Sequence, residues 1–449
     1  MTQDAELSLG DDRSIARWWS WAVATAMGHG AMGQSLFSIA DQAVVSGTSF
    51  LTAVIVGRAS LPEDLGRYYL TLTIVLTLVG LHEALVAAPY LVFGARRRGR
   101  ELSEYTGSMW VQHIALTAVG TILVVALALL APQLDAERLA PSLWAVAIMA
   151  PFILFREGVR RFSFARLRSH VALAMDLVVC VIQLGLLLAL WSVGRLSVPI
   201  VFVVMGAASG LACCGWSLSK PGRPLVSTNV LALHWRENWA FSRWTVLSYF
   251  TVDTIPFMMP WLIGIAAGPA AIGLYGGCAT LLGVTNILVH GAGNYMRPKA
   301  AHAFAVDGVP ALKYVLLLTG SVFAVVFGLL CLAFFATGDL LAVVVFGPEF
   351  QGTGWLLTLL AANVLAGSLG YVAGSGLWAL GQPRASMIAD ACMLVATLVS
   401  AWLLIAPYGP VGAALAAVIG TTIGTMLKIL TVHWALEPFS PATKTKSVT

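Results

Sequence analysis

The chain has 449 residues, of which 59% are hydrophobic and only 10% are charged, and its formal net charge is +5. An average soluble domain carries charge on roughly 25% of its residues. So few charges exclude a soluble globular protein, a disordered chain and a collagen-like or disulfide-stapled chain. The composition instead predicts an all-α polytopic membrane protein whose outer surface faces lipid.

Twelve apolar stretches are long enough to cross a bilayer, for which a helix needs about 20 residues. The stretches in the first half of the chain are 34–56, 68–94, 108–131, 139–155, 171–192 and 198–216. Those in the second half are 240–265, 271–289, 314–337, 355–377, 385–405 and 411–432. No connecting segment is long enough for a folded soluble domain. The sequence therefore predicts twelve transmembrane helices in two six-helix bundles.

The basic residues predict how these helices are oriented, because cytoplasmic loops of membrane proteins are rich in Lys and Arg. With the N-terminus placed in the cytoplasm, the 26 Lys and Arg residues fall on the cytoplasmic side, with the exceptions of Arg58, Arg67, Arg138 and Arg195. A wrong number of helices would scramble this alternation after the error. We therefore expect a multi-pass protein with both termini in the cytoplasm.

Two further segments are predicted to be amphipathic surface helices. Residues 15–32 contain three tryptophans and form either a helix lying on the inner leaflet or a thirteenth span. The first reading is favoured, since a span there would invert the charge pattern. The predicted units are a cytoplasmic N-terminus (1–33), a first bundle (34–216), a cytoplasmic linker with a surface helix (217–239), a second bundle (240–433) and a cytoplasmic tail (434–449).

The loops after the first and seventh predicted spans share a pattern. Over Gly57–Tyr68 and Gly264–Tyr275, the residues Gly, Ala, Pro, Leu or Ile, Gly and Tyr recur at the same spacing. Any short outer loop favours Gly and Pro, which explains the residue types but not the shared spacing. The two halves then form a parallel repeat about an axis along the membrane normal, an arrangement found in transporters.

Carboxylates inside the predicted spans are candidate functional groups, because a charge at the bilayer centre costs roughly 2.5–3.5 kcal/mol. We interpret Asp41, Glu83 and Asp253 as candidate sites for a coupling ion or proton. The alternative interpretations of each residue are that it pairs with an arginine or that it makes a hydrogen bond between helices. Asp176 and Asp390 lie nearer the cytoplasmic ends of their spans and are expected to reach water.

Basic residues at the inner ends of the spans form a second set of candidates. The simple interpretation is that they obey the positive-inside rule and bind anionic membrane lipids. The more specific hypothesis is that some of them face a central cavity and hold a pyrophosphate, since the arginine fork binds phosphate oxygens bidentately. The residues proposed for that role are Arg156, Arg160, Arg243 and Arg297, with Arg161 and Lys299 beside them.

Motifs of soluble enzymes are not found in the sequence. It contains no Walker A motif, no HExxH and no dinucleotide fingerprint on a strand. We therefore expect no enzymatic activity, no metal, no cofactor and no nucleic-acid partner. Transport would be driven by an ion gradient, the membrane potential or the substrate gradient.

Three regions together resemble a known family. They are Asp41–Thr52 with Pro62–Gly66, then Gly268–Gly273 with Asn286 and Pro298, and finally Gly381–Pro383 with Tyr408–Ala414. Over nearly the whole chain the sequence resembles Wzx-type flippases of lipid-linked oligosaccharides, in the multidrug/oligosaccharidyl-lipid/polysaccharide (MOP) exporter superfamily. The shared motifs are mostly Gly and Pro packing signals, which are specific for the fold and weak for the substrate.

The resemblance implies a function in polysaccharide biosynthesis at the inner membrane of a bacterium. An undecaprenyl-pyrophosphate-linked oligosaccharide would be moved by alternating access from the cytoplasmic to the periplasmic leaflet. Polysaccharide assembly proteins are the partners that this role implies. A second hypothesis on the same fold is a proton- or sodium-coupled exporter of organic cations, of the MATE type, that uses Asp41, Glu83 or Asp253. A membrane enzyme is the third, although the chain lacks the large loop or soluble domain expected of one.

Overall fold

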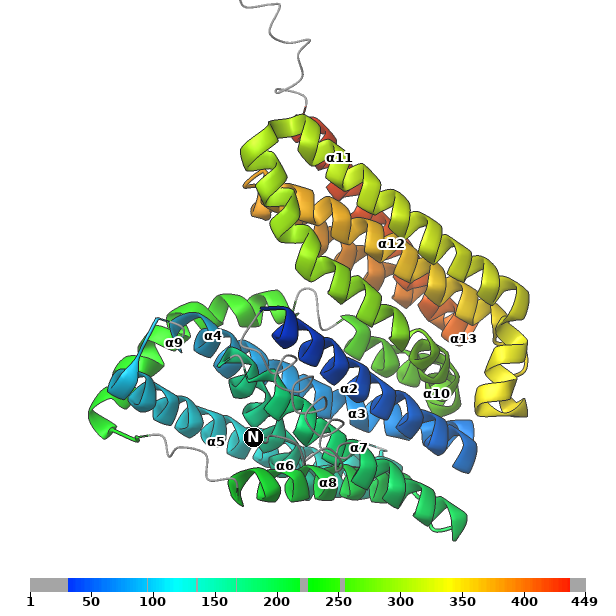
Figure 1. The fold of residues 1–449 in the computed structure, drawn as a ribbon. Coiled ribbons are helices and arrows are strands. Elements are labelled where there is room, and N and C mark those ends of the chain that lie inside the picture. Colours follow the sequence, from blue (N-terminus) through cyan, green and yellow to red (C-terminus); the bar gives the residue numbers. More distant parts are fainter. Residues whose placement is uncertain are drawn as a thin grey trace, which may run out of the picture.

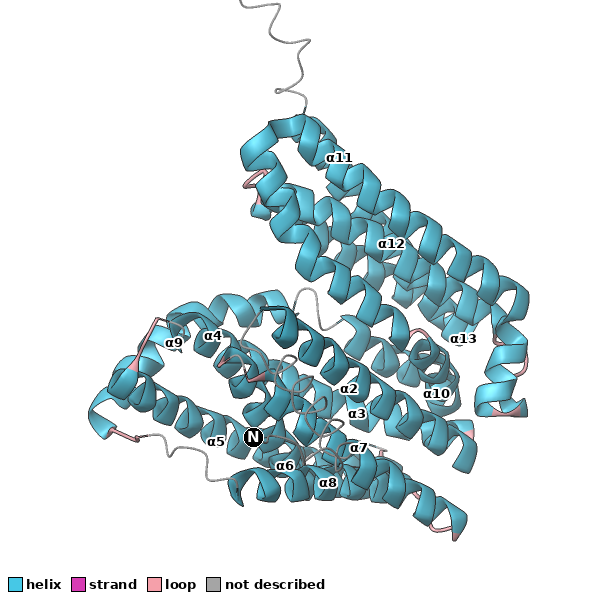
Figure 2. Ribbon diagram, in the orientation of Figure 1, coloured by secondary structure: helices cyan, strands magenta, loops and turns pink. Residues whose placement is uncertain are grey.

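The computed structural model describes residues 31–94, 96–134, 136–166, 168–218, 225–250 and 255–436. Within these residues every regular element is a helix (Figure 2). The all-helical expectation is confirmed for this part of the chain. Asp253 and residues 15–30 of the predicted segment 15–32 lie outside the described residues, and the side chain of Arg297 is likewise not described.

The first half of the chain folds into long helices joined by short turns. They are α2 (Ala31–Ala59), α3 (Pro62–His82), η1 (Glu83–Ala87), α4 (Ala88–Gly94), α5 (Gly99–Leu130), η2 (Ala131–Leu134), η3 (Glu137–Leu139), α6 (Ala140–Ala165), α7 (Ser169–Ser192) and α8 (Val198–Leu218). Pro62 occupies the first position of α3, where a proline's missing N–H costs nothing. Helix α6 packs against α5, α7 and α8, and α2 packs against α7.

The second half contains fewer and longer helices. They are α9 (Thr228–Ser248), α10 (Ile255–Leu281), α11 (Gly283–Phe346), η5 (Pro348–Phe350), α12 (Gly354–Ala379) and α13 (Pro383–Leu436). Figure 1 shows α11, α12 and α13 gathered on one side of the molecule and α2–α8 on the other, with α10 beside α3. Helix α9 lies across the end of the first group of helices (Figure 1).

Ten of the described helices are long and apolar enough to cross a membrane, against the twelve predicted. The difference arises because α10 and α13 each continue through a kink where a loop between two spans was predicted, at residues 266–270 and 406–410. Gly308 (φ 72°) interrupts α11 and Gly409 (φ 55°) interrupts α13, in backbone conformations that a residue with a side chain rarely adopts. A proline follows each kink closely, at Pro310 and Pro410, and supports the start of the next helical segment.

The predicted seventh span, residues 240–265, includes residues 251–254, which lie outside the described residues. Helix α9 runs through residue 240 to Ser248, and α10 begins at Ile255 with Pro256 next. Helix α10 then contains its own kink at Gly268 (φ 82°), followed by Pro269. The predicted loop at 266–270 is therefore a bend within α10.

The two loops of the repeat meet at the crossing of α3 and α10. A Cβ atom on Gly66 would overlap the carbonyl oxygen of Pro269, and a Cβ atom on Gly273 would overlap the carbonyl oxygen of Pro62. The contact is reciprocal, since Gly66 matches Gly273 and Pro62 matches Pro269 in the repeated pattern. Two backbones approach this closely only where side chains are missing.

Further contacts hold this end of the molecule together, which we call the α3–α10 end. The hydroxyl of Tyr69 lies 2.6 Å from that of Thr280, and the indole of Trp261 donates to Thr73. Arg58, at the end of α2, donates to the backbone carbonyls of Val344 and Val345 in α11. Polar and close-packed contacts therefore join both halves of the chain here.

Candidate functional site

A group of ionised side chains lies buried among α2, α6 and α7. Asp41 in α2 is 0% exposed, Asp176 in α7 is 2% exposed, and Arg160 in α6 is 7% exposed. Helix α6 supplies Arg156, Glu157, Arg160 and Arg161, and the spacing of a helix places them on neighbouring faces. We call these residues, together with Glu83, the buried ion network.

Arg160 is the centre of the network. Its Nη2 atom lies 2.7 Å from Oδ2 of Asp41, its Nε atom lies 2.9 Å from Oδ2 of Asp176, and its Nη1 atom lies 3.1 Å from Oε1 of Glu157. Arg156 binds Asp176 from the other side, with Nη2 2.6 Å from Oδ1. The guanidinium of Arg160 therefore joins carboxylates that come from three different helices.

Asp41 and Asp176 also face each other. Both carboxylates bind the guanidinium of Arg160, Asp41 at Nη2 and Asp176 at Nε, so they lie close together, and Oδ1 of Asp41 has no hydrogen-bond partner among the described residues. Two ionised carboxylates at this distance repel each other, whereas one proton between them makes a hydrogen bond. A proton shared by the two carboxylates would replace their repulsion with a hydrogen bond.

The network reaches a more open region through Arg161. This residue donates to Glu157 over 2.7 Å and pairs with Glu83 over 2.6 Å. The side chains of Arg161 and Glu83 are 34% and 45% exposed. Ion pairs thus lead from an accessible carboxylate at Glu83 to the buried pair of Asp41 and Asp176.

Two histidines lie beside the open part of the network. The rings of His82 and His113 are 4.9 Å apart, edge to face, and His82 binds the hydroxyl of Thr117. Gly158, between the charged residues of α6, leaves room for His113, because a Cβ there would lie 2.8 Å from the imidazole. The glycine therefore lets the second histidine reach the network.

The balance of charge in the network is negative. Its carboxylates are Asp41, Glu83, Glu157 and Asp176, and its guanidinium groups are those of Arg156, Arg160 and Arg161. There is one carboxylate more than there are guanidinium groups. One proton shared by Asp41 and Asp176 makes the network neutral, which is the favourable state in a low-dielectric interior.

The structure brings some of the sequence candidates together and separates others. One network contains Asp41, Glu83, Arg156 and Arg160. From the sequence, the acids were expected to bind a coupling ion or proton and the arginines to bind a pyrophosphate. Arg243 lies apart on α9, exposed, with its guanidinium 5.4 Å from the ring of Trp244. Arg156 and Arg160 therefore bind a phosphate only by giving up a carboxylate partner.

The prediction for Asp176 is wrong, and Glu157 was missed. Asp176 was expected to reach water, but it is buried because two arginines of α6 neutralise it. Glu157 was overlooked because the predicted fourth span ended at residue 155, whereas α6 continues to Ala165. The signal for it was available: an acid among three arginines at helical spacing, directly after an apolar run.

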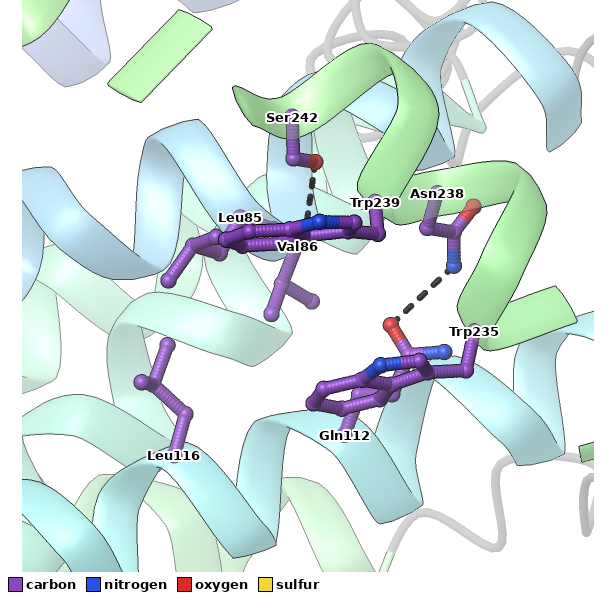
Figure 3. Close-up of a pocket in the computed structure, with 8 residues that line it drawn as sticks. All are labelled: Leu85, Val86, Gln112, Leu116, Trp235, Asn238, Trp239 and Ser242. Carbon is purple, nitrogen blue, oxygen red and sulfur yellow. Dashed lines mark hydrogen bonds between the residues drawn. The ribbon is translucent and has the colours of Figure 1, made fainter. Parts of the chain in front are cut away.

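Helix α9 is docked through a polar face. His234, Asn238 and Ser242 are buried, one turn apart, while Trp235 and Trp239 are 54% and 53% exposed. Asn238 donates to Gln112 over 3.0 Å and Ser242 to the carbonyl of Leu85, as Figure 3 shows. The two indoles flank a small pocket of about 90 Å³ (Figure 3). Tryptophans exposed in this way are typical of a helix at the membrane interface.

An ion pair and a buried imidazole add to this docking. Glu237 of α9 accepts from Arg97 over 2.6 Å, and Nδ1 of His234 lies 2.8 Å from the hydroxyl of Ser108. Burial lowers the pKa of His234 below its usual value of 6.5, and the nearby guanidinium of Arg97 lowers it further. The imidazole is therefore neutral where α9 is docked.

The other side of α9 borders a large apolar groove of about 940 Å³. Trp244 and Leu247 of α9 form one wall, Trp378 of α12 contributes, and the first part of α13 forms the opposite wall. We call it the α9–α13 groove. Helix α9 packs against η1, α4 and α5 of the first group of helices, so the groove separates that group from α12 and α13, whereas the α3–α10 end joins the two groups.

No family model matches the sequence, and no curated protein matches it either. Solved structures do match over most of the chain. The lipid II flippase MurJ, in an inward closed conformation, gives a TM-score of 0.66 at 14% identity, covering 89% of this chain and 87% of that one.

Two other similar structures are MOP superfamily transporters. An inward-facing multidrug resistance MATE family transporter gives a TM-score of 0.64 at 15% identity, covering 95% of this chain and 99% of that one. A MOP superfamily transporter from Pyrococcus furiosus gives 0.61 at 14% identity, covering 90% and 94%. These neighbours are transporters and flippases, not enzymes. The chain is thus a multi-pass membrane protein with the fold of the MOP superfamily transporters.

Proposed function

We propose that the chain crosses the membrane twelve times, in two six-helix bundles with both termini in the cytoplasm. The kinks at Gly268, Gly308 and Gly409 support this arrangement. In this arrangement each of the three kinks is a turn between two membrane crossings. The break between α10 and α11 at Leu282 lies within one crossing. The helices then divide into the twelve spans. The α3–α10 end then faces the outside, and the α9–α13 groove faces the cytoplasm.

The transported molecule that we propose is an oligosaccharide carried on undecaprenyl pyrophosphate, moved from the cytoplasmic to the outer leaflet by alternating access. The similarity to a lipid flippase supports a lipid substrate. A groove open at one end and a close-packed contact at the other suit a transporter that opens to one side at a time. Arg243 and Arg297 are the arginines that we propose for the pyrophosphate.

The coupling of transport to protons rests on a single observation, the buried pair of Asp41 and Asp176 within a network that lacks one positive charge. Uptake of a proton neutralises the network, and its release leaves a buried negative charge that favours a rearranged state. A ligand or proton drives a conformational change only through a difference in affinity between two states. Arg160, which reaches α2, α6 and α7, is the group through which the proton acts on the helices.

The coupling is tested by measuring flipping of a fluorescent undecaprenyl-pyrophosphate oligosaccharide in liposomes with and without an imposed pH gradient. We expect the gradient to raise the wild-type rate, and Asp41→Asn and Asp176→Asn to abolish that response. Asp64→Asn is the matched control, since Asp64 pairs with Arg67 at the surface. A full response in Asp41→Asn would refute proton coupling at this pair.

Export of organic cations is the second candidate, and the excess of carboxylates in the network favours it. A cationic substrate would bind at Glu83, the exposed end of the network, where it balances the additional carboxylate among the network residues. This function predicts that ethidium is exported in a pH-dependent manner and that Glu83→Gln weakens its binding. A protein that flips the lipid-linked sugar and does not move ethidium excludes this candidate.

A further inference from the structure

The α9–α13 groove is elongated along α13. Its residues on α13 extend from Pro383 to Val399, which is about 24 Å of helix at 1.5 Å per residue. Met387, Val395 and Val399 present apolar surface over this length, opposite Trp244 and Leu247. An elongated apolar surface suits a hydrocarbon chain better than a compact ligand.

The charges at the groove are suited to an anion. The one carboxylate in its lining, Asp390, is already paired with Lys428 over 2.6 Å. Arg384 lines the groove, and Arg243 directly precedes its lining residue Trp244. Both arginines are exposed, and no carboxylate of the described residues lies within ion-pair distance of either. The groove therefore combines an apolar channel with unpaired positive charge.

We propose that the α9–α13 groove binds the polyprenyl chain of a phosphate-bearing lipid, with the phosphate at Arg384 and Arg243. The proposal rests on the proposed flippase function and adds to it the place where the substrate's tail lies.

The position of the groove gives the tail a route. The groove lies between α9 and α13, so that a tail held there remains at the boundary of the two groups of helices while the sugar enters the space between them. Movement of the groups changes the separation of Trp244 and Leu247 from α13. Binding of the tail is therefore coupled to the opening of this end.

The test uses the full-length protein in detergent and native mass spectrometry, with undecaprenyl phosphate as the probe. Ala391 lines the groove and is exposed, so Ala391→Trp fills the channel. We expect this variant to bind undecaprenyl phosphate at least roughly tenfold more weakly than the wild type does, a loss of about 1.4 kcal/mol in binding free energy. Ala324→Trp is the matched control, since Ala324 is an exposed alanine of α11 outside the groove lining, and it should bind as the wild type does.

A second variant tests the phosphate. Wild-type protein should prefer undecaprenyl phosphate to undecaprenol, and Arg384→Gln should remove that preference while retaining undecaprenol. Equal binding of the probe to Ala391→Trp and wild type would overturn the proposal. Displacement of the probe by an equal concentration of phosphatidylglycerol would also overturn it, because the groove would then be a general lipid site.

The flipping assay separates this proposal from the proposed function. If wild-type protein binds the probe in the groove but flips no lipid-linked sugar, the function fails and the groove proposal stands. If wild type and Ala391→Trp flip equally well and bind the probe equally, the function stands and the groove proposal fails.

Discussion

Arg160 shows how a single residue makes a buried network possible. Its guanidinium contacts Asp41, Asp176 and Glu157, all of which are 9% exposed or less. A buried pair adds little stability by itself, because desolvation offsets the attraction. Removing one partner is different, since it leaves a buried charge without compensation.

We expect Arg160→Gln to lower the free energy of unfolding by about 3–5 kcal/mol, the usual cost of breaking a buried pair. The measurement is the midpoint of thermal unfolding in detergent. Arg100→Gln is the control and should leave the midpoint unchanged, because the Arg100 side chain is 84% exposed. Adding Asp41→Asn to Arg160→Gln should recover part of the loss; no recovery would mean that Asp41 is not the stranded charge.

Sequence reasoning at the residue scale identified members of the network but not their pairing. Asp41 and Glu83 stood out because charges are rare in apolar stretches, and Arg156, Arg160 and Arg161 because they follow the predicted fourth span at its inner end. The pairing depends on helices that are far apart in sequence, as with Asp41 and Arg160, which are separated by 119 positions. One sequence without the fold contains no information on which acid lies against which arginine.

At the scale of elements, the predictions succeeded where charged loops separate the spans and failed where they do not. The loop of arginines between α4 and α5 was located correctly, as was the turn between α2 and α3. Helices α10 and α13 continue through Gly–Pro bends with no charged residue near the turn, whereas the bend of α11 at Gly308 directly follows Asp307. The repeated Gly and Pro residues were recognised as a pattern, but their mutual contact became visible only in the fold.

The glycines of the α3–α10 crossing provide a test of closure at that end. Gly66→Ala and Gly273→Ala each place a methyl group against a proline carbonyl, which cannot move as a flexible side chain does. We expect both variants to widen the distance between spin labels at Leu61 and Ile265, measured by electron paramagnetic resonance in a cysteine-free background. Gly328→Ala should have no effect, since nothing lies within 4 Å of its Cβ position. Unchanged distances in all three would show that this contact does not hold the end closed.

Docking of α9 should weaken in acid because His234 is buried in its neutral form. Its pKa in the folded protein is lowered from 6.5, so the undocked helix binds more protons once the pH falls below about that value. Protonation therefore favours release, and the stability of docking decreases as the pH falls. We expect faster hydrogen exchange in α9 at pH 5.5 than at pH 7.5, after correction for the intrinsic rate, and a smaller difference in His234→Gln.

At the scale of the whole molecule, the arrangement of positive charge and the kinks lead to the same topology. Reporter enzymes active only outside the cytoplasm distinguish twelve crossings from ten. Fusions at Gly347 and Gly409 should be active, and fusions at Gly308 and after Thr449 should be inactive. Equal activity at Gly308 and Gly347 would mean that the second part of α11 does not cross the membrane.

The ion network also has a consequence for how the protein is made. Helix α2 leaves the ribosome before α6, and at 5–20 residues per second the 119 positions between Asp41 and Arg160 take roughly 6–24 seconds to synthesise. During this time Asp41 is in the membrane or at its edge with no arginine beside it. The first helix must therefore be retained by its apolar residues alone, and arrival of α6 is the step that fixes it in place. In a chain without Arg160, Asp41 would still lack this partner after α6 has arrived.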